Sequence, residues 1–171
     1  MQVFEGRLHV HYGQAYVFSG GEGDTSELDA CFRGQANGLI GAGRQGMLYL
    51  LTGLHTGLVE LAVDLVEHEP CLDDAWEEAV EVSFSPAASD VRLVDWGGEP
   101  VCDVPLELRD YRVRYAARGM DAGRAADALV GDAAPVDSYR LWFWPAPSAP
   151  DIILRQTSEA AAYSHDWAQS L

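Results

Sequence analysis

Residues 58–84 read LVELAVDLVEHEPCLDDAWEEAVEVSF, and this stretch decides the fold class. Two segments in which apolar and polar residues alternate enclose an acidic segment. Alternation with a period of two is typical of a β-strand that buries one face. A sheet with one face on a core and the other in water is typically antiparallel. The residues expected to point into the core are Val59, Leu61, Val63, Leu65, Val80, Val82 and Phe84.

Similar apolar segments recur at short spacing along the rest of the chain. A glycine-rich turn is expected at residues 19–26, and Asn37-Gly38 is the dipeptide most typical of a two-residue hairpin turn. About eight strands with little helix predict an all-β fold, an antiparallel β-sandwich. Further strands are expected at residues 8–18, 47–51, 91–96, 101–108, 110–115, 139–144 and 151–154.

The sandwich domain is expected to span residues 1–146. Three prolines within residues 145–150 interrupt strand pairing, because proline has no N–H group to donate. Residues 147–171 are then a C-terminal extension, with a short helix over residues 157–168. We expect this helix to pack on the sandwich.

The chain is strongly acidic. Its 171 residues carry a formal net charge of −16, and all eleven basic residues are arginines. Between Arg44 and Arg92 there are ten acidic residues and no basic one. Proteins bind nucleic acid through Lys and Arg that displace counterions, so this charge argues against nucleic acid as a partner and favours a basic protein. The absence of lysine also excludes a Walker-type phosphate site and Schiff-base chemistry.

No pattern points to secretion, a membrane, a cofactor or a structural metal. Cys31, Cys71 and Cys102 are far apart and form no C-x-x-C pair. The first residues lack the charged and apolar regions of a signal peptide, and no run of about 18 apolar residues could span a bilayer. The lysine-free composition is typical of a GC-rich bacterial genome. We therefore expect a cytoplasmic bacterial protein without membrane contact.

The acidic segment is the strongest candidate for a binding site. It lacks the D-x-[DN]-x-[DN]-G pattern of a calcium loop. Trp76 lies among the acids, and an aromatic side chain ringed by charge suits an anchor in a protein interface. Charge would steer a basic partner, such as a nuclease or toxin, and the carboxylates would take the place of DNA phosphates. The expected partner-binding residues are Glu67, Glu69, Asp73, Asp74, Trp76, Glu77 and Glu78.

Four arginines occur within ten residues, at positions 109, 112, 114 and 118. Arginine binds phosphate and carboxylate groups, so a ligand pocket is one interpretation. Arg112 and Arg114 alternate with apolar residues and are therefore expected on a solvent-facing side of a strand. The favoured interpretation is ion pairing across strands. The candidate acidic partners are Glu60, Asp64 and Glu81.

A small-ligand or carbohydrate-binding sandwich is an alternative function. Trp142 and Trp144 share one face of a predicted strand, and aromatic rings on such a face, or Trp96, could stack on a sugar. The competing interpretation is that the C-terminal helix covers Trp142 and Trp144 with Tyr163 and Trp167.

A metal-dependent enzyme is a second alternative. His9 and His11 form an H-x-H pair, and a metal site there would need a third ligand such as His55. The chain has no G-x-S-x-G or H-E-x-x-H motif. Residues 41–46 match G-x-G-x-x-G but lack the strand before and the helix after that a dinucleotide site requires. We therefore expect a noncatalytic protein without a cofactor.

Several segments, taken in order, resemble the small bacterial competence protein J family. The first is residues 10–18, with a tyrosine, a glutamine and an apolar run; residues 37–40 and the strand at 80–84 follow. The last is residues 106–113, where a leucine and a polar turn precede an Asp-Tyr pair. The resemblance covers residues 8–145 and is one of order and spacing. It implies a small inhibitor of a DNA-entry nuclease, without assigning contact residues.

Overall fold

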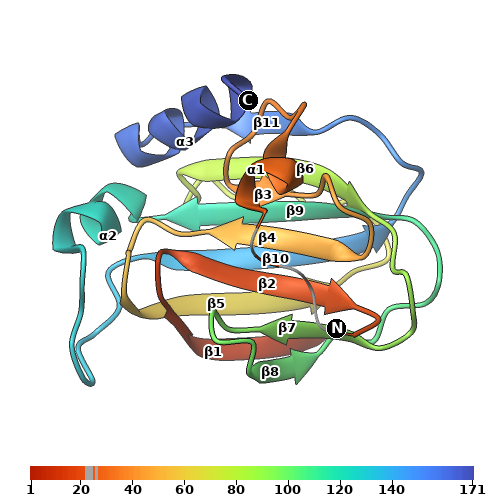
Figure 1. Ribbon diagram of the computed structural model, residues 1–171, viewed down its shortest axis with the longest axis horizontal. Helices are drawn as coiled ribbons and strands as arrows, with labels where there is room; N and C mark the ends of the chain where they lie inside the picture. Colours follow the sequence, from red (N-terminus) through yellow and green to blue (C-terminus); the bar gives the residue numbers. More distant parts are fainter. Residues whose placement is uncertain (22–24, 26) are drawn as a thin grey trace.

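The computed structural model describes residues 1–21, 25 and 27–171, which form two facing β-sheets (Figure 1). The glycine-rich turn expected at 19–26 lies partly outside these residues. No helix of the described chain has the length and apolarity needed to cross a membrane. The helices are α1 (Leu28–Phe32), α2 (Met120–Ala126) and α3 (Glu159–Gln169). The strands are β1 (Gln2–Val10), β2 (Gln14–Ser19), β3 (Ile40–Gly41), β4 (Met47–Leu51), β5 (Gly57–Leu65), β6 (Glu78–Phe84), β7 (Val91–Val94), β8 (Pro100–Asp103), β9 (Tyr111–Arg118), β10 (Ser138–Pro145) and β11 (Ile152–Arg155).

Sheet A has the strand order β1-β5-β10-β9-β6-β11, and sheet B has the order β3-β4-β2-β7-β8. β5 and β10 pair in parallel, whereas the other neighbours pair antiparallel. This architecture confirms the all-β sandwich, with eleven described strands rather than about eight and with one parallel pair. Alternation predicts which face of a strand is buried, but it does not predict the direction of the neighbouring strand.

Residues 8–18 form two strands rather than the single strand expected. β1 ends in sheet A, and β2 begins in sheet B. Between them Tyr12 and Gly13 both have positive φ, 54° and 63°, and the Gln14 N–H donates to the His11 carbonyl at 3.2 Å. The pattern did not reveal this turn because tyrosine is atypical at a position with positive φ.

The main core lies between the two sheets. Its residues include the inward-facing side chains predicted for β5 and β6, and Leu65 packs against them from the end of β5. β9 and β10, which lie between β5 and β6 in sheet A, contribute the large rings of Tyr115 and Tyr139. The predicted core residues that are buried are Val59, Leu61, Val63, Val80, Val82 and Phe84.

A second apolar cluster covers the outer face of sheet B. Tyr49 of β4 contacts the ring of Tyr16 at a centroid distance of 4.9 Å and that of Phe32 at 6.0 Å. Phe32 belongs to α1 and in turn meets Trp167 of α3, at 5.2 Å. β4 is therefore buried on both faces, which explains its continuous apolar sequence.

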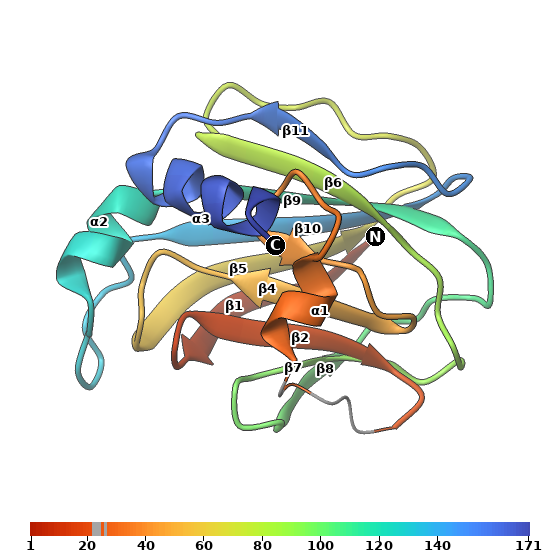
Figure 2. The same cartoon turned by 45° about the horizontal axis from the view of Figure 1, so that its top comes forward.

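Residues 147–171 contribute a strand as well as a helix. β11 pairs with β6 and forms one edge of sheet A. α3 follows Ser158, whose hydroxyl accepts a hydrogen bond from the Ala161 N–H at 3.1 Å as an N-cap. α2 and α3 lie side by side at one end of the sandwich (Figure 2). There the Asp121 carboxylate accepts the N–H groups of Glu159 and Ala160.

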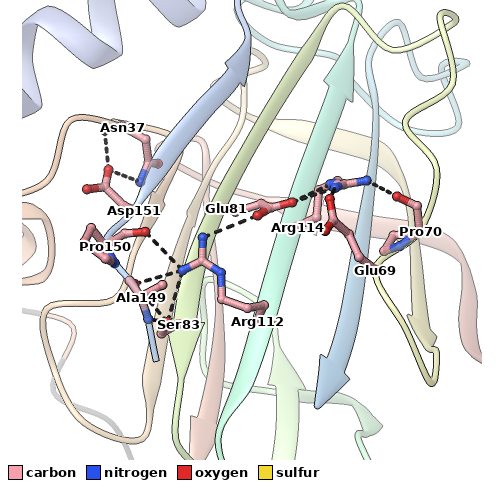
Figure 3. Close-up of polar contacts among 10 residues, drawn as sticks. All are labelled: Asn37, Glu69, Pro70, Glu81, Ser83, Arg112, Arg114, Ala149, Pro150 and Asp151. Atoms are coloured by element: carbon pink, nitrogen blue, oxygen red, sulfur yellow. Dashed lines mark hydrogen bonds and ion pairs between the residues drawn. The ribbon is translucent and has the colours of Figure 1, made fainter. Parts of the chain in front are cut away.

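Asn37-Gly38 does not form the expected hairpin turn. Asn37 is buried, and its Oδ1 accepts the N–H groups of Leu39 and Ile40 at 3.1 and 2.9 Å. Its own N–H and its Nδ2 donate to the Asp151 carboxylate at 2.8 and 3.1 Å (Figure 3). The dipeptide therefore connects the body of the sandwich to the tail.

Gly38 allows α3 to approach closely. A Cβ at this position would overlap the carbonyl oxygen of Ser164 in α3. The Gly38 N–H donates to Nδ1 of His165 at 2.9 Å, and the imidazole is buried. Nε2 of the same ring has no hydrogen-bond partner among the described residues.

We expect His165 to make the fold less stable in weak acid. Burial lowers the pKa of this imidazole below its ordinary value. The unfolded chain therefore binds more protons than the folded chain below about pH 6.5, and stability falls toward the lowered pKa by at most about 1.4 kcal/mol per pH unit. His165→Gln keeps an acceptor for Gly38 but does not titrate, so it should remove this part of the pH dependence. Urea unfolding at a series of pH values measures the effect.

The matched control is His68→Gln, because His68 is exposed. It should leave the pH dependence of the wild-type protein unchanged. An identical pH dependence in wild type and His165→Gln would contradict the assignment to His165.

Candidate functional site

The acidic segment crosses the outer face of sheet A. β5 and β6 run in the same direction, with β10 and β9 between them. Residues 66–77 must therefore pass over two strands to connect them. We call residues 66–77 the acidic crossover. Its contacts are with side chains of sheet A that point away from the core.

Arg114 of β9 holds the first part of the acidic crossover against the sheet (Figure 3). Its side chain is only 2% exposed. Nε and Nη2 donate to Oε1 of Glu81 at 2.9 and 2.6 Å, and Nη2 also donates to Oε1 of Glu69 at 2.8 Å. Nη1 donates to the carbonyl oxygen of Pro70. The buried cation is thus paired with a strand carboxylate and with the crossover.

Arg112 connects the same Glu81 to the start of the tail. Its Nη2 lies 3.4 Å from Oε2 of Glu81. Its Nη1 donates to the Ser83 hydroxyl at 3.1 Å and to the carbonyls of Ala149 and Pro150 at 2.9 and 3.2 Å (Figure 3). Two arginines therefore share one carboxylate, and each also binds a different covering segment.

Ion pairing across strands explains these arginines better than a ligand pocket. The predicted pairing of Arg112 and Arg114 with Glu81 is confirmed. Their predicted place on a solvent-facing side is wrong, because the acidic crossover and residues 149–150 cover that face. Asp64 pairs instead with Arg140, at 2.7 Å.

Arg155 of β11 fixes the second part of the acidic crossover. Its Nη1 donates to the backbone carbonyls of Asp73 and Trp76 at 2.9 and 2.7 Å, and its Nη2 donates to the Asp74 carboxylate at 3.0 Å. At the end of the crossover, Oε2 of Glu77 accepts the Gly119 N–H at 2.8 Å. The backbone of the crossover is therefore held at several points.

The structure brings most of the predicted partner-binding residues together on this crossover. The acidic residues among them are exposed, even where one carboxylate oxygen also contacts an arginine or a backbone N–H. The exposed residues of the predicted set are Glu67, Glu69, Asp73, Asp74 and Glu77.

Glu78 is not part of this surface. It is 0% exposed, because it is the first residue of β6 and points inward. Its carboxylate accepts the N–H groups of Thr157 and Ser158, the shortest at 2.6 Å. Burial raises the pKa of Glu78, although these hydrogen bonds counteract the increase. Its role in this structure is to hold the start of α3.

Trp76 packs on sheet A and is not an exposed anchor for a protein interface. Its ring is half-buried and meets Trp142 edge-on at 6.0 Å, with the Arg118 guanidinium 5.6 Å from its centroid. The expectation that α3 covers Trp142 and Trp144 is wrong. The crossover covers Trp142, and Trp144 is 5% exposed beneath Arg114. Trp144 is therefore closed to a sugar, and Trp142 is half-buried.

The two histidines of the H-x-H pair are not brought into a metal site by the described chain. His9 is exposed on β1, and Nδ1 of His11 lies 2.8 Å from the Thr56 hydroxyl. The His55 ring is close to that of His11, at 5.7 Å between centroids. No group of three or more His, Cys, Asp or Glu with metal-binding geometry occurs among the described residues.

We expect Arg114→Met to loosen the acidic crossover and to destabilise the fold. Removing one member of a buried ion pair leaves the other charge unpaired and costs about 3–5 kcal/mol. Urea unfolding measures this loss, and faster amide hydrogen exchange in residues 69–77 would report the loosened crossover. Arg109→Met is the control, because Arg109 is exposed. Slow exchange in the crossover of Arg114→Met would contradict the anchoring role.

No family model matches this chain, and no curated protein matches its sequence. Solved structures do share its fold. ComJ from Bacillus subtilis, described as an inhibitor of the DNA degrading activity of NucA, superposes with a TM-score of 0.55 at 13% identity, over 85% of this chain and 98% of ComJ. The product of crocagin biosynthetic gene J gives 0.55 at 11% identity, over 86% and 98%. These superpositions establish a shared fold, which confirms the distant resemblance to ComJ found in the sequence.

Proposed function

We propose that this chain is a noncatalytic protein that binds and inhibits a basic partner, such as a nuclease or toxin, through the acidic crossover. The observation that carries the proposal is the fixed, solvent-facing arrangement of five carboxylates on one connection. Their residues are Glu67, Glu69, Asp73, Asp74 and Glu77.

The anchoring of the crossover favours binding. A connection of twelve residues without regular structure would lose conformational freedom on association, and that loss weakens affinity. Arg114 and Arg155 already hold this backbone to the sheet. The carboxylates are therefore presented in a fixed arrangement, as the phosphates of a nucleic acid are.

The charge of the chain favours a basic partner. A net charge of −16 attracts a basic protein over a distance of about a Debye length and repels nucleic acid. Exposed carboxylates at an interface raise the association rate and make binding sensitive to salt. The shared fold with an inhibitor of a DNA-degrading enzyme supports a nuclease as the partner. Action in the cytoplasm of a bacterium is part of this proposal.

Neutralising the crossover should weaken binding. In the variant Glu67→Gln, Asp73→Asn, Asp74→Asn and Glu77→Gln, each amide keeps an acceptor oxygen but loses its charge. We expect inhibition of DNA degradation by NucA, used as the test nuclease, to weaken about tenfold or more at low salt, because each exposed pair contributes about 0.2–1 kcal/mol. The salt dependence should flatten.

The matched control removes four exposed charges elsewhere. It combines Asp90→Asn, Asp103→Asn, Glu107→Gln and Asp132→Asn. The control should retain most of the inhibition. Equal losses in the two variants would indicate net charge alone, and unchanged inhibition in the crossover variant would contradict the proposal. Capture of native partners from bacterial lysate at low and high salt would then identify the cognate protein, which we expect to be basic.

A further inference from the structure

The exposed aromatic side chains of the described residues gather at one end of the sandwich, away from the acidic crossover's anchors on β9 and β11. Tyr12 is 56% exposed in the turn between β1 and β2, and Trp96 is 42% exposed in the turn between β7 and β8. Their ring centroids are 5.7 Å apart. Tyr163 of α3 is 64% exposed and lines a cavity of about 240 Å³ together with Tyr12.

Two histidines complete this cluster. The His11 ring lies 4.3 Å from that of Tyr12 and 4.7 Å from that of Trp96. His55 lies 5.1 Å from Tyr12, in a T-shaped arrangement. We call His11, Tyr12, His55 and Trp96 the aromatic end. Its residues come from three connections that are far apart in sequence, so only the fold brings them together.

Tyr12 occupies a backbone conformation that tyrosine disfavours. Both central residues of its turn have positive φ, which is the requirement of a type I′ hairpin turn and is met best by Asn-Gly. A non-glycine residue in this region is strained, and a bulky one is unusual. Its ring is more than half exposed, so burial in the core does not explain the choice. Strain kept at an exposed aromatic residue suggests a binding role.

Carboxylates border the aromatic end. Asp95 precedes Trp96, and Glu99 is exposed in the same turn. Asp127 is exposed, and its backbone carbonyl accepts the N–H groups of His55 and Thr56 at 3.1 and 3.0 Å. Rings flanked by negative charge attract a cation, and they bind arginine best because its planar guanidinium can stack on a ring and also pair with a carboxylate.

The same end already holds one arginine in this way. The Arg124 guanidinium lies 4.7 Å from the centroid of the Tyr163 ring, beside the cavity that Tyr12 and His55 line. The chain therefore provides an internal example of the contact that an external arginine would make with Tyr12 or Trp96.

We propose that the aromatic end receives an arginine side chain of a basic protein partner. This inference rests on the proposed function and adds to it a second contact that fixes the orientation of the partner. Trp76 was the aromatic anchor expected from the sequence, but its ring is engaged with Trp142 and Arg118. Tyr163 is exposed but is already in contact with Arg124, so Tyr12 and Trp96 are the exposed rings left to receive an arginine of a partner.

Oligoarginine and oligolysine peptides of equal length test the proposal, with affinities measured by titration calorimetry at low salt. Their charges are equal, so the difference between them isolates the guanidinium contact. We expect oligoarginine to bind the wild-type chain more tightly. Trp96→Ala and Tyr12→Asn should each reduce its affinity about two- to tenfold and remove the preference over oligolysine.

Tyr12→Asn separates binding from folding. Because it creates the Asn-Gly pair preferred in this turn, we expect it to raise the melting temperature by about 2–4 °C while it weakens binding. Leu108→Ala is the control, since Leu108 is exposed in the connection between β8 and β9, at the opposite end of the strands. It should change neither affinity nor preference.

The outcomes distinguish this inference from the proposed function. If the neutralised crossover loses oligoarginine binding while Trp96→Ala and Tyr12→Asn retain it, the aromatic end is excluded and the crossover remains. If the aromatic variants lose the arginine preference while the neutralised crossover keeps it, the aromatic end is supported and the crossover is not. Oligosaccharide binding or self-association that disappears in Trp96→Ala would overturn the proposal, because it would assign the surface to a sugar or to a second copy.

Discussion

A cation removed from water has to be paired within the protein, and the pairing of Arg114 organises one whole face of this sandwich. Its guanidinium binds Glu81 within sheet A and Glu69 in the connection above it. Glu81 also binds Arg112, which reaches the carbonyls of residues 149 and 150. One ion-pair cluster therefore joins two neighbouring strands to two segments that are far apart in sequence. The acidic crossover and the start of the tail both owe their positions to it.

Much of the sandwich could be predicted from local patterns, because burial of one strand face leaves a period of two in the sequence. This is why the inward residues of β5 and β6 were identified correctly. The order and direction of the strands depend on contacts between distant segments, so the parallel pairing of β5 with β10 left no local signal. The change of sheet at Tyr12 was missed for a different reason. Its turn uses a residue that the backbone conformation disfavours.

The candidate surface was predicted in part. The exposed carboxylates of the acidic crossover were identified by their density, but composition cannot separate Glu77 from Glu78. Glu77 is the last exposed residue of the crossover, whereas Glu78 begins β6 and points inward. Arg112 and Arg114 alternate with apolar residues, which is the pattern of a solvent-exposed face. In the structure, the acidic crossover and residues 149–150 cover that face. The aromatic end was not predicted as one surface, although His11 with His55, and separately Trp96, had been considered as ligand-binding residues. Its rings come from three places in the sequence, residues 11–12, 55 and 96, and the Tyr-Gly pair in a tight turn was the one local signal available.

The tail has a further consequence for association between molecules. β11 is a short strand near the chain terminus, and it completes the edge of sheet A beside β6. If β11 detached, β6 would expose unpaired backbone N–H and C=O groups. The β11 segment of a second copy of the chain could then pair with them. The fold therefore contains a route to strand exchange between two chains. The hydrogen bonds that Asp151 and Glu78 accept hold the tail against its own chain. They therefore also favour the monomer over a strand-exchanged dimer.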